Sequence, residues 1–150
     1  NFSLDDWKLL HKLQPFIEDR LPTLTELFYH QLLFNDKTSS FLEGRVDTLR
    51  HTHLEWLKDI FRRDFNQEYI DFLKNIGIVH ATLNIPSSFI TASMCFIRSQ
   101  IPRFITEEDA TKIGTDRAIL ASSVIKMIDI NQFIIDRSYY NQLMKITGFI

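Results

Sequence analysis

The sequence predicts an all-α domain, and three observations carry that prediction. Thirteen phenylalanines stand against four glycines and four prolines, and 45% of the 150 residues are apolar. Such a composition is dense, poor in turns and typical of helices. Apolar residues recur at helical spacing, most clearly at positions 69, 72, 73, 76 and 83. Finally, helix-start residues precede several of these stripes. The length suits one domain with one hydrophobic core.

Charge and cysteine content exclude several classes of protein. A net charge of −2 and an isoelectric point near 6.2 argue against a nucleic-acid or polybasic membrane surface. The single cysteine, Cys95, excludes an internal disulfide and fits the reducing cytoplasm. No apolar run approaches the ~20 residues of a membrane span, and no signal peptide is recognisable, so we expect no membrane segment. The chain begins at Asn1 without methionine, which suggests a domain cut from a longer protein.

The first predicted helix begins after Ser3, an N-cap residue followed by Asp5 and Asp6, and bends at Pro15. Its apolar stripe consists of Leu4, Trp7, Leu10, Leu13 and Ile17.

A second helix is predicted from Thr23 to about Phe34, because Pro22 suits a helix start. Turn-forming residues from 35 to 40 then predict a loop. The residues expected to face inward from this helix are Leu24, Leu27, Phe28, Tyr29 and Leu32.

A third helix is predicted from about Gly44 to Phe61. His53 lies on its apolar face, whereas His51 is rotated about 160° toward solvent, at ~100° per residue. The apolar face comprises Val46, Leu49, His53, Trp56, Leu57 and Ile60.

The fourth predicted helix begins after Asn66 and carries His80 on its apolar face, in register with Ile76 and Leu83. Asn84 and Pro86 end it. A histidine on such a face must pair both ring nitrogens inside the protein or bind a ligand.

The helix after Pro86 has apolar rows on two sides and breaks at Pro102, so we expect it to pack between two partners. Thr106 caps a last helix with no stop signal before Gly148, about 40 residues or ~60 Å long. That exceeds what a compact domain needs. We therefore expect a homodimer through the last two helices. Its apolar surface would include Met94, Ile97, Ile128 and Phe133.

Several motifs, in this order and separation, resemble the globin-coupled sensor family from about residue 4 to 135. The motifs are Leu27-Phe28-Tyr29, Phe41, Leu54-Glu55-Trp56-Leu57, Ile76-Gly77-Ile78-Val79-His80 and Leu83-Asn84-Ile85-Pro86. The resemblance implies a globin-like helical sandwich with a long C-terminal helix, a heme-based sensor fused to an output module. It also implies that His80 is the proximal heme ligand and that Tyr29 donates a hydrogen bond to the bound gas.

Two departures from the family pattern matter. Family members often follow the histidine with a basic residue and a glycine, where this chain has Thr82 and Asn84, so the residues that hold the heme propionates stay unassigned. His53 stands at a distal position that is usually apolar. We predict that His53 binds the sixth iron position when no gas does, and the alternative is a hydrogen bond from Tyr29 or a pocket water.

The expected site binds one b-type heme between the His53 and His80 helices. Its iron ligands are His80 and His53, and its diatomic ligand is oxygen, carbon monoxide or nitric oxide. Cys95, between Met94 and Phe96, is expected to be a buried, inert thiol. The predicted heme-contacting residues are Phe28, Tyr29, Phe41, Leu49, His53, Trp56, Ile76, His80, Leu83 and Ile85.

The function expected from these features is gas or redox sensing, signalled through the last helix to an output module. No nucleophile–base constellation is present, so the domain itself is not expected to be an enzyme. Two alternatives stay open: a stand-alone oxygen-binding or redox globin, and a heme-free interaction module.

Overall fold

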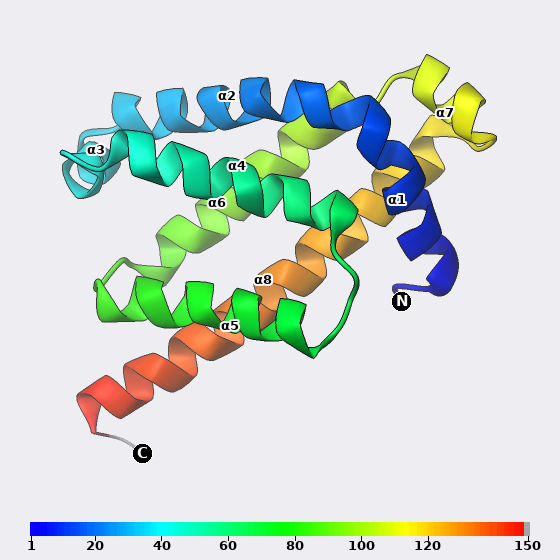
Figure 1. The fold of residues 1–150 in the computed structure, drawn as a ribbon. Helices are drawn as coiled ribbons and strands as arrows, with labels where there is room; N and C mark the ends of the chain where they lie inside the picture. Colours follow the sequence, from blue (N-terminus) through cyan, green and yellow to red (C-terminus); the bar gives the residue numbers. More distant parts are fainter. Residues whose placement is uncertain (149–150) are drawn as a thin grey trace.

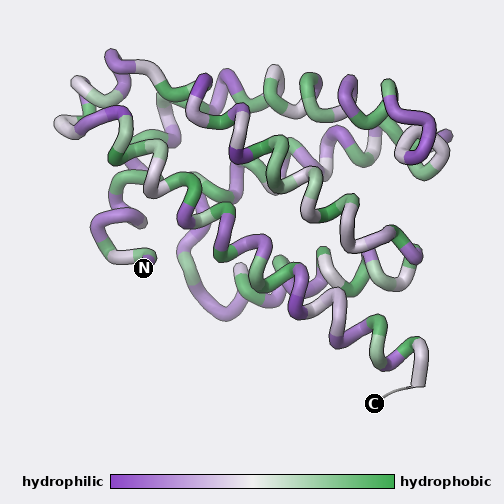
Figure 2. The backbone as a smooth tube through the Cα atoms, turned by 180° about the vertical axis from the view of Figure 1, so that it is seen from behind, coloured by the Kyte–Doolittle hydropathy of each residue, from purple (hydrophilic) through white to green (hydrophobic). Residues whose placement is uncertain are grey.

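The computed structural model describes residues 1–148, and these residues form helices and no strands, as predicted (Figure 1). Hydrophobic and hydrophilic residues alternate along each helix (Figure 2), which fits helices that each bury one face. The elements are α1 (Leu4–Ile17), η1 (Glu18–Arg20), α2 (Leu21–Phe34), α3 (Asp36–Leu42), α4 (Val46–Arg62), α5 (Gln67–Thr82), α6 (Ser87–Gln100), η2 (Ile101–Phe104), α7 (Glu107–Ile113) and α8 (Arg117–Thr147).

Three predicted helix starts are confirmed in atomic detail. The hydroxyls of Ser3 and Thr106 each accept a hydrogen bond from the backbone N–H of an aspartate three residues later, and that carboxylate accepts one from the cap's own N–H. The Asn66 side chain accepts a hydrogen bond from the N–H of Tyr69. Each contact satisfies donors that a helix start otherwise leaves unpaired.

Two predicted segments are wrong. The expected loop at 35–40 is mostly the short helix α3, which begins because the Asn35 side chain accepts from the N–H of Lys37. The expected 40-residue last helix is two helices, because Gly114 adopts a left-handed φ of +87° and ends α7. The stop predicted at Gly148 is confirmed as the C-cap of α8.

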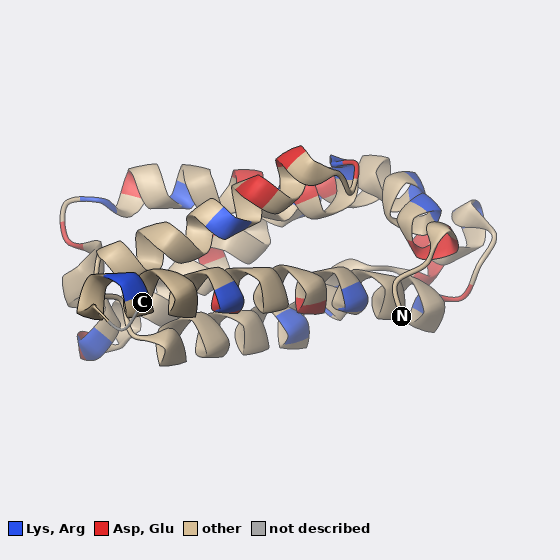
Figure 3. Cartoon of the chain, turned by 90° about the horizontal axis from the view of Figure 1, so that it is seen from below, with Lys and Arg blue, Asp and Glu red and all other residues tan. Residues whose placement is uncertain are grey.

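Helix α8 runs diagonally through the fold and packs against α1, α5, α6 and α7 (Figure 1). Helices α2 and α4 pack on each other, and α1 links α4 to α8. Acidic and basic residues are interspersed along the helices in the view from below (Figure 3). By length and composition alone α8 is apolar enough to cross a membrane, a test that core helices of soluble proteins also pass.

Most predicted core residues are buried or partly buried, but three expected inward residues are exposed. Leu4 is 65% exposed at the first turn of α1. Leu27 is 43% exposed, because the buried stripe of α2 runs through positions 21, 24, 25, 28 and 29 and position 27 lies beside it. Leu83, also expected to face inward, is 49% exposed at the C-cap of α5.

Helices α5 and α8 touch backbone to backbone at Gly77. A Cβ atom at this position would lie 2.4 Å from the carbonyl oxygen of Ile135 and 2.8 Å from the backbone nitrogen of Tyr139. On either side of this contact, the Ser138 hydroxyl donates to the Lys74 carbonyl over 2.6 Å, and the Tyr139 hydroxyl donates to the Ile85 carbonyl over 2.8 Å. The helix that carries His80 is therefore firmly attached to α8.

Candidate functional site

The two candidate histidines stand on helices that do not pack closely on each other. His53 belongs to α4, which packs on α1 and α2, and His80 belongs to α5, which packs along α8. Within residues 1–148, α4 and α5 are not one of the closely packed helix pairs. Figure 1 shows α4 crossing in front of α6, and α5 crossing in front of α8. The fold therefore places the two histidine-bearing helices apart, each packed on different partner helices.

His80 is held in one tautomer by its own helix. Its Nδ1 lies 2.8 Å from the carbonyl oxygen of Ile76, one turn earlier. A carbonyl only accepts, so Nδ1 carries the hydrogen and donates it, and Nε2 keeps its lone pair. Burial lowers the pKa of the imidazole more than the hydrogen bond to Ile76 raises it, so the ring is neutral.

His53 has a different partner. Its Nδ1 lies 3.1 Å from the hydroxyl oxygen of Thr25 on α2. The ring of Phe28, one turn along α2, stacks on the imidazole with 4.3 Å between centroids and an interplanar angle of 9°. Burial lowers the pKa of His53 to about 3, so this imidazole is neutral as well. Neither the predicted partner Tyr29 nor any other described side chain pairs with Nε2.

Two further aromatic residues surround His53. Tyr29 meets its ring edge-on at 5.7 Å, and Trp56 lies 5.4 Å away. The Tyr29 ring is buried, and among the described residues its hydroxyl has no hydrogen-bond partner. Burial raises the pKa of this phenol to about 12, so it stays protonated and able to donate. The Trp56 Nε1–H donates to Asn131 of α8 over 2.9 Å.

The structure thus joins some of the predicted site residues and leaves others apart. Phe28, Tyr29, His53 and Trp56 form one aromatic cluster, and Ile76 pairs with His80 through its carbonyl. The side chains of the remaining four have no hydrogen bond or ring contact with either histidine in residues 1–148, although the Ile85 backbone N–H donates to the His80 carbonyl over 3.0 Å. Of these, Phe41 packs edge-on against Phe89, Leu49 is partly buried, Leu83 is exposed, and Ile85 accepts from Tyr139.

The prediction for Cys95 is wrong. Its thiol was expected to be buried, but the residue is exposed on α6. The buried row of α6 runs through Ile90, Met94 and Ile97, and one position along a helix turns the side chain by about 100°. Cys95 therefore points away from the core.

Two residues important to the site were not predicted. Thr25 is buried one turn before Phe28, on the same face of α2. Asn131 is fully buried on α8, where it also pairs with the Tyr69 hydroxyl at 3.2 Å. The available signal was a polar residue in the apolar row of each helix, since Asn131 is three residues after Ile128 and four before Ile135.

The two histidines can supply few ligands to a metal ion, so they fit a metal that a cofactor already coordinates. Within residues 1–148, no three His, Cys, Asp or Glu side chains gather as a metal site. Each histidine instead offers one unpaired Nε2, and the surroundings of His53 are aromatic. A metal bound here by either ring needs its other ligands from a cofactor, and the porphyrin of a heme supplies four.

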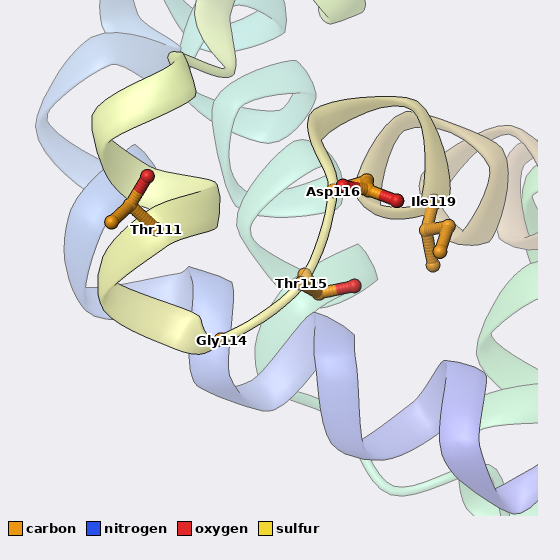
Figure 4. A pocket seen from close by; sticks show the side chains of 5 residues that line it. All are labelled: Thr111, Gly114, Thr115, Asp116 and Ile119. Atoms are coloured by element: carbon orange, nitrogen blue, oxygen red, sulfur yellow. The ribbon is translucent and has the colours of Figure 1, made fainter.

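Two surface hollows of the described residues contain neither candidate histidine. One lies between α7 and the start of α8 and contains no histidine or aromatic side chain (Figure 4). Its lining residues are Thr111, Gly114, Thr115, Asp116 and Ile119.

Comparisons with known proteins agree with this fold. No curated protein sequence matches the chain significantly. Among solved structures, the chain is similar to the globin domain of a globin-coupled sensor from Geobacter sulfurreducens. The two are 27% identical with a TM-score of 0.80, over 92% of this chain and 91% of the other, so the predicted globin-like fold is confirmed. The sequence profile of the Protoglobin family matches residues 1–145, so the chain belongs to the protoglobin family.

Proposed function

We propose that this protoglobin is a heme-based gas or redox sensor domain in which His80 is the permanent iron ligand and His53 an exchangeable one. Membership of a globin family implies heme binding. The observation that carries the assignment of His80 is its geometry. The Ile76 carbonyl holds the hydrogen on Nδ1, and a neutral imidazole with a free Nε2 lone pair is a metal ligand.

The cofactor in this proposal is a b-type heme. With one cysteine, which is exposed on α6 and not followed by histidine, the chain has no attachment motif for a c-type heme. When bound, the heme would supply an iron that takes up oxygen, carbon monoxide or nitric oxide and changes its redox state.

Five side chains would bind the iron, contact its gas ligand or shape the pocket. His80 would bind the iron from α5, and His53 would compete with a diatomic ligand from α4. Tyr29 would donate its unpaired hydroxyl hydrogen to that ligand, because its raised pKa keeps the phenol protonated. Phe28 and Trp56 hold the His53 ring and keep the pocket around it apolar.

A sensing role is supported by helix α8, which is 31 residues or ~47 Å long and is attached to the His80 helix. Its C-terminal half leaves Phe133 65% exposed, Tyr140 51% and Met144 46%. We propose that this surface contacts a second copy of the chain. Three residues expected on that surface, Met94, Ile97 and Ile128, are instead buried in the core of one chain. A stable dimer would bury on the order of 1,600 Å².

The domain catalyses no reaction of its own in this proposal. It works in the cytoplasm and passes its state to an output module. The similarity to a globin domain of a globin-coupled sensor supports this reading over that of a stand-alone carrier.

Heme titration of the purified protein tests the proposal. We expect one heme per chain, with a Soret band that His80→Ala abolishes or alters strongly in both oxidation states. His30→Ala is the matched control, because His30 is exposed on α2. An unchanged spectrum in His80→Ala would contradict the assignment, and no Soret band in the unmutated protein would leave a heme-free interaction module.

A further inference from the structure

The partners of the two histidine Nδ1 atoms differ in a way that changes what each ring can do. The partner of His80 is the Ile76 carbonyl, which can only accept a hydrogen bond. The partner of His53 is the Thr25 hydroxyl, which can accept or donate. His80 is therefore restricted to one tautomer, whereas Nδ1 of His53 has a hydrogen-bond partner in either tautomer.

The Thr25 hydroxyl is available for both roles because it is not bonded to its own helix. The threonines at positions 52, 82 and 91 donate to the carbonyl four residues earlier, at 3.0, 2.8 and 3.3 Å. Thr25 also lies inside a helix, but its hydroxyl pairs with His53, and no bond to its own backbone is formed. The residue is only 2% exposed, so water does not compete readily for this hydroxyl.

The position of the His53 ring does not depend on which nitrogen carries the hydrogen. Phe28 stacks on one face at 4.3 Å, and Trp56 and Tyr29 lie beside the ring at 5.4 and 5.7 Å. These contacts are insensitive to the tautomer. Because Nδ1 is directed to α2, Nε2 lies on the side of the imidazole away from α2.

We propose that Thr25 is a positioning residue that lets His53 alternate between binding iron and donating a hydrogen bond. When Nδ1–H donates to Thr25, Nε2 has a free lone pair and can ligate. When the Thr25 hydroxyl donates to Nδ1, Nε2 carries the hydrogen and can donate it to a diatomic ligand. The net change moves one proton from Nδ1 to Nε2 through solvent water, and the ring stays neutral. This inference rests on the proposed role of His53 as an exchangeable ligand.

The test compares Thr25→Val, which keeps the shape and removes the hydroxyl, with Thr25→Ser, which keeps the hydroxyl. Thr23→Val makes the same change at an exposed position of α2 and is the control. The first readout is the ratio of low-spin to high-spin ferric heme. The second is the dissociation rate of oxygen from the ferrous protein.

Thr25→Val should lower the low-spin ratio about tenfold and speed oxygen dissociation by a similar factor, the size of one lost hydrogen bond to a buried group. Thr25→Ser and Thr23→Val should resemble the unmutated protein. In a His53→Ala background, Thr25→Val should have no further effect on either readout, because its influence passes through His53.

The outcomes separate this inference from the proposed function. If His53→Ala leaves the ferric spectrum unchanged, His53 is not a ligand, and both proposals fail. If His53→Ala alters the spectrum but Thr25→Val matches the unmutated protein, only the role of Thr25 is overturned. If Thr25→Val changes the spin ratio alone, Thr25 supports one tautomer, and the alternation is overturned.

Discussion

The two helices that carry the candidate ligands are attached to α8 in different ways. On the α5 side, the backbones touch at Gly77, and two hydrogen bonds from α8 reach backbone carbonyls at Lys74 and Ile85. The Tyr69 hydroxyl of α5 also pairs with Asn131 of α8. On the α4 side, among the described residues, one side-chain hydrogen bond joins α4 to α8, from Trp56 to Asn131. The α5 attachment cannot shift without moving the backbone, while the α4 attachment can break and reform by side-chain motion.

This difference suits a sensor in which one ligand stays and the other leaves. His80 keeps a fixed position relative to α8. Exchange of the other iron ligand is therefore not expected to move α5. A displacement of His53, in contrast, reaches Trp56 three residues along α4, and Trp56 contacts both His53 and Asn131. The weaker attachment is therefore the one through which a signal can travel to α8.

The largest expected effect on the free energy of unfolding is that of Gly77→Ala, which disrupts the contact between α5 and α8. In an exposed helix, replacing glycine by alanine stabilises by about 1 kcal/mol. Here the new Cβ meets backbone atoms of Ile135 and Tyr139, which cannot turn away, so we expect a loss of about 3 kcal/mol. Urea unfolding measures this change.

The control is Gly114→Ala, where no atom lies within 4 Å of the new Cβ but the φ is +87°. Its cost should be only about 1–2 kcal/mol, from backbone strain. Equal losses in the two variants would mean that α5 and α8 separate easily, and the comparison between the two sides would not hold.

The next effect in size comes from Asn131→Ala, which removes the side-chain hydrogen bond that joins α4 to α8. It also removes the contact of Tyr69 of α5 with Asn131, but α5 keeps its backbone contacts with α8 at Gly77. Trp56 Nε1–H and the Tyr69 hydroxyl both lose a buried partner, so we expect a loss of about 2–3 kcal/mol. Hydrogen exchange should speed up in α4 more than in α5. Asn141→Ala, at an exposed position of α8, is the control. Equal acceleration in both helices would argue against a separate connection to α4.

Sequence reasoning predicted the helices best where the signals are local. Caps such as Asn66 and Thr106 act within three residues, and apolar stripes need only one helix. Helix α3 was missed because its residues are turn formers by composition, and its start depends on the Asn35 cap. The break before α8 could not be predicted from periodicity, because a glycine such as Gly114 ends a helix only where the fold gives it a positive φ.

The difference between local and long-range contacts also decides what could be predicted of the candidate site. The partner of His80 lies four residues back on the same helix, so it could be predicted without knowing the fold. The partner of His53 is 28 residues away on α2, and the contact of Trp56 with Asn131 spans 75 residues. Such pairs depend on how helices pack, and periodicity shows only that a polar residue stands in a buried row.

The third prediction concerns acid, which should loosen the α1 and α2 side before the α5 attachment. Arg20, between α1 and α2, donates two hydrogen bonds to Asp109 of α7, at 2.5 and 3.0 Å. These bonds from Arg20 hold the pKa of Asp109 at about 2, against a usual 3.8. At Asp6 of α1, burial raises the pKa, but hydrogen bonds from Ser123 and other donors outweigh it and bring the value to about 2. The contacts at Gly77, Ser138 and Tyr139 involve no carboxylate.

Folding stability falls at low pH because the folded protein binds protons at Asp109 less readily than the unfolded chain does. The folded pKa of Asp109 lies below the unfolded one, so its contribution is complete above pH 4 and is lost as the pH falls from about 4 to 2. That contribution is at most about 2 kcal/mol. Urea midpoints measured across this range should fall steeply in the unmutated protein. They should fall less in Asp109→Asn, which is already destabilised at neutral pH, and Asp6 would account for the remaining slope. Asp116→Asn, at an exposed carboxylate, should keep the full slope. Hydrogen exchange at pH 3 should then rise in α1 and α2 while α5 stays protected, and early exchange of α5 would show that the two sides do not differ in this way.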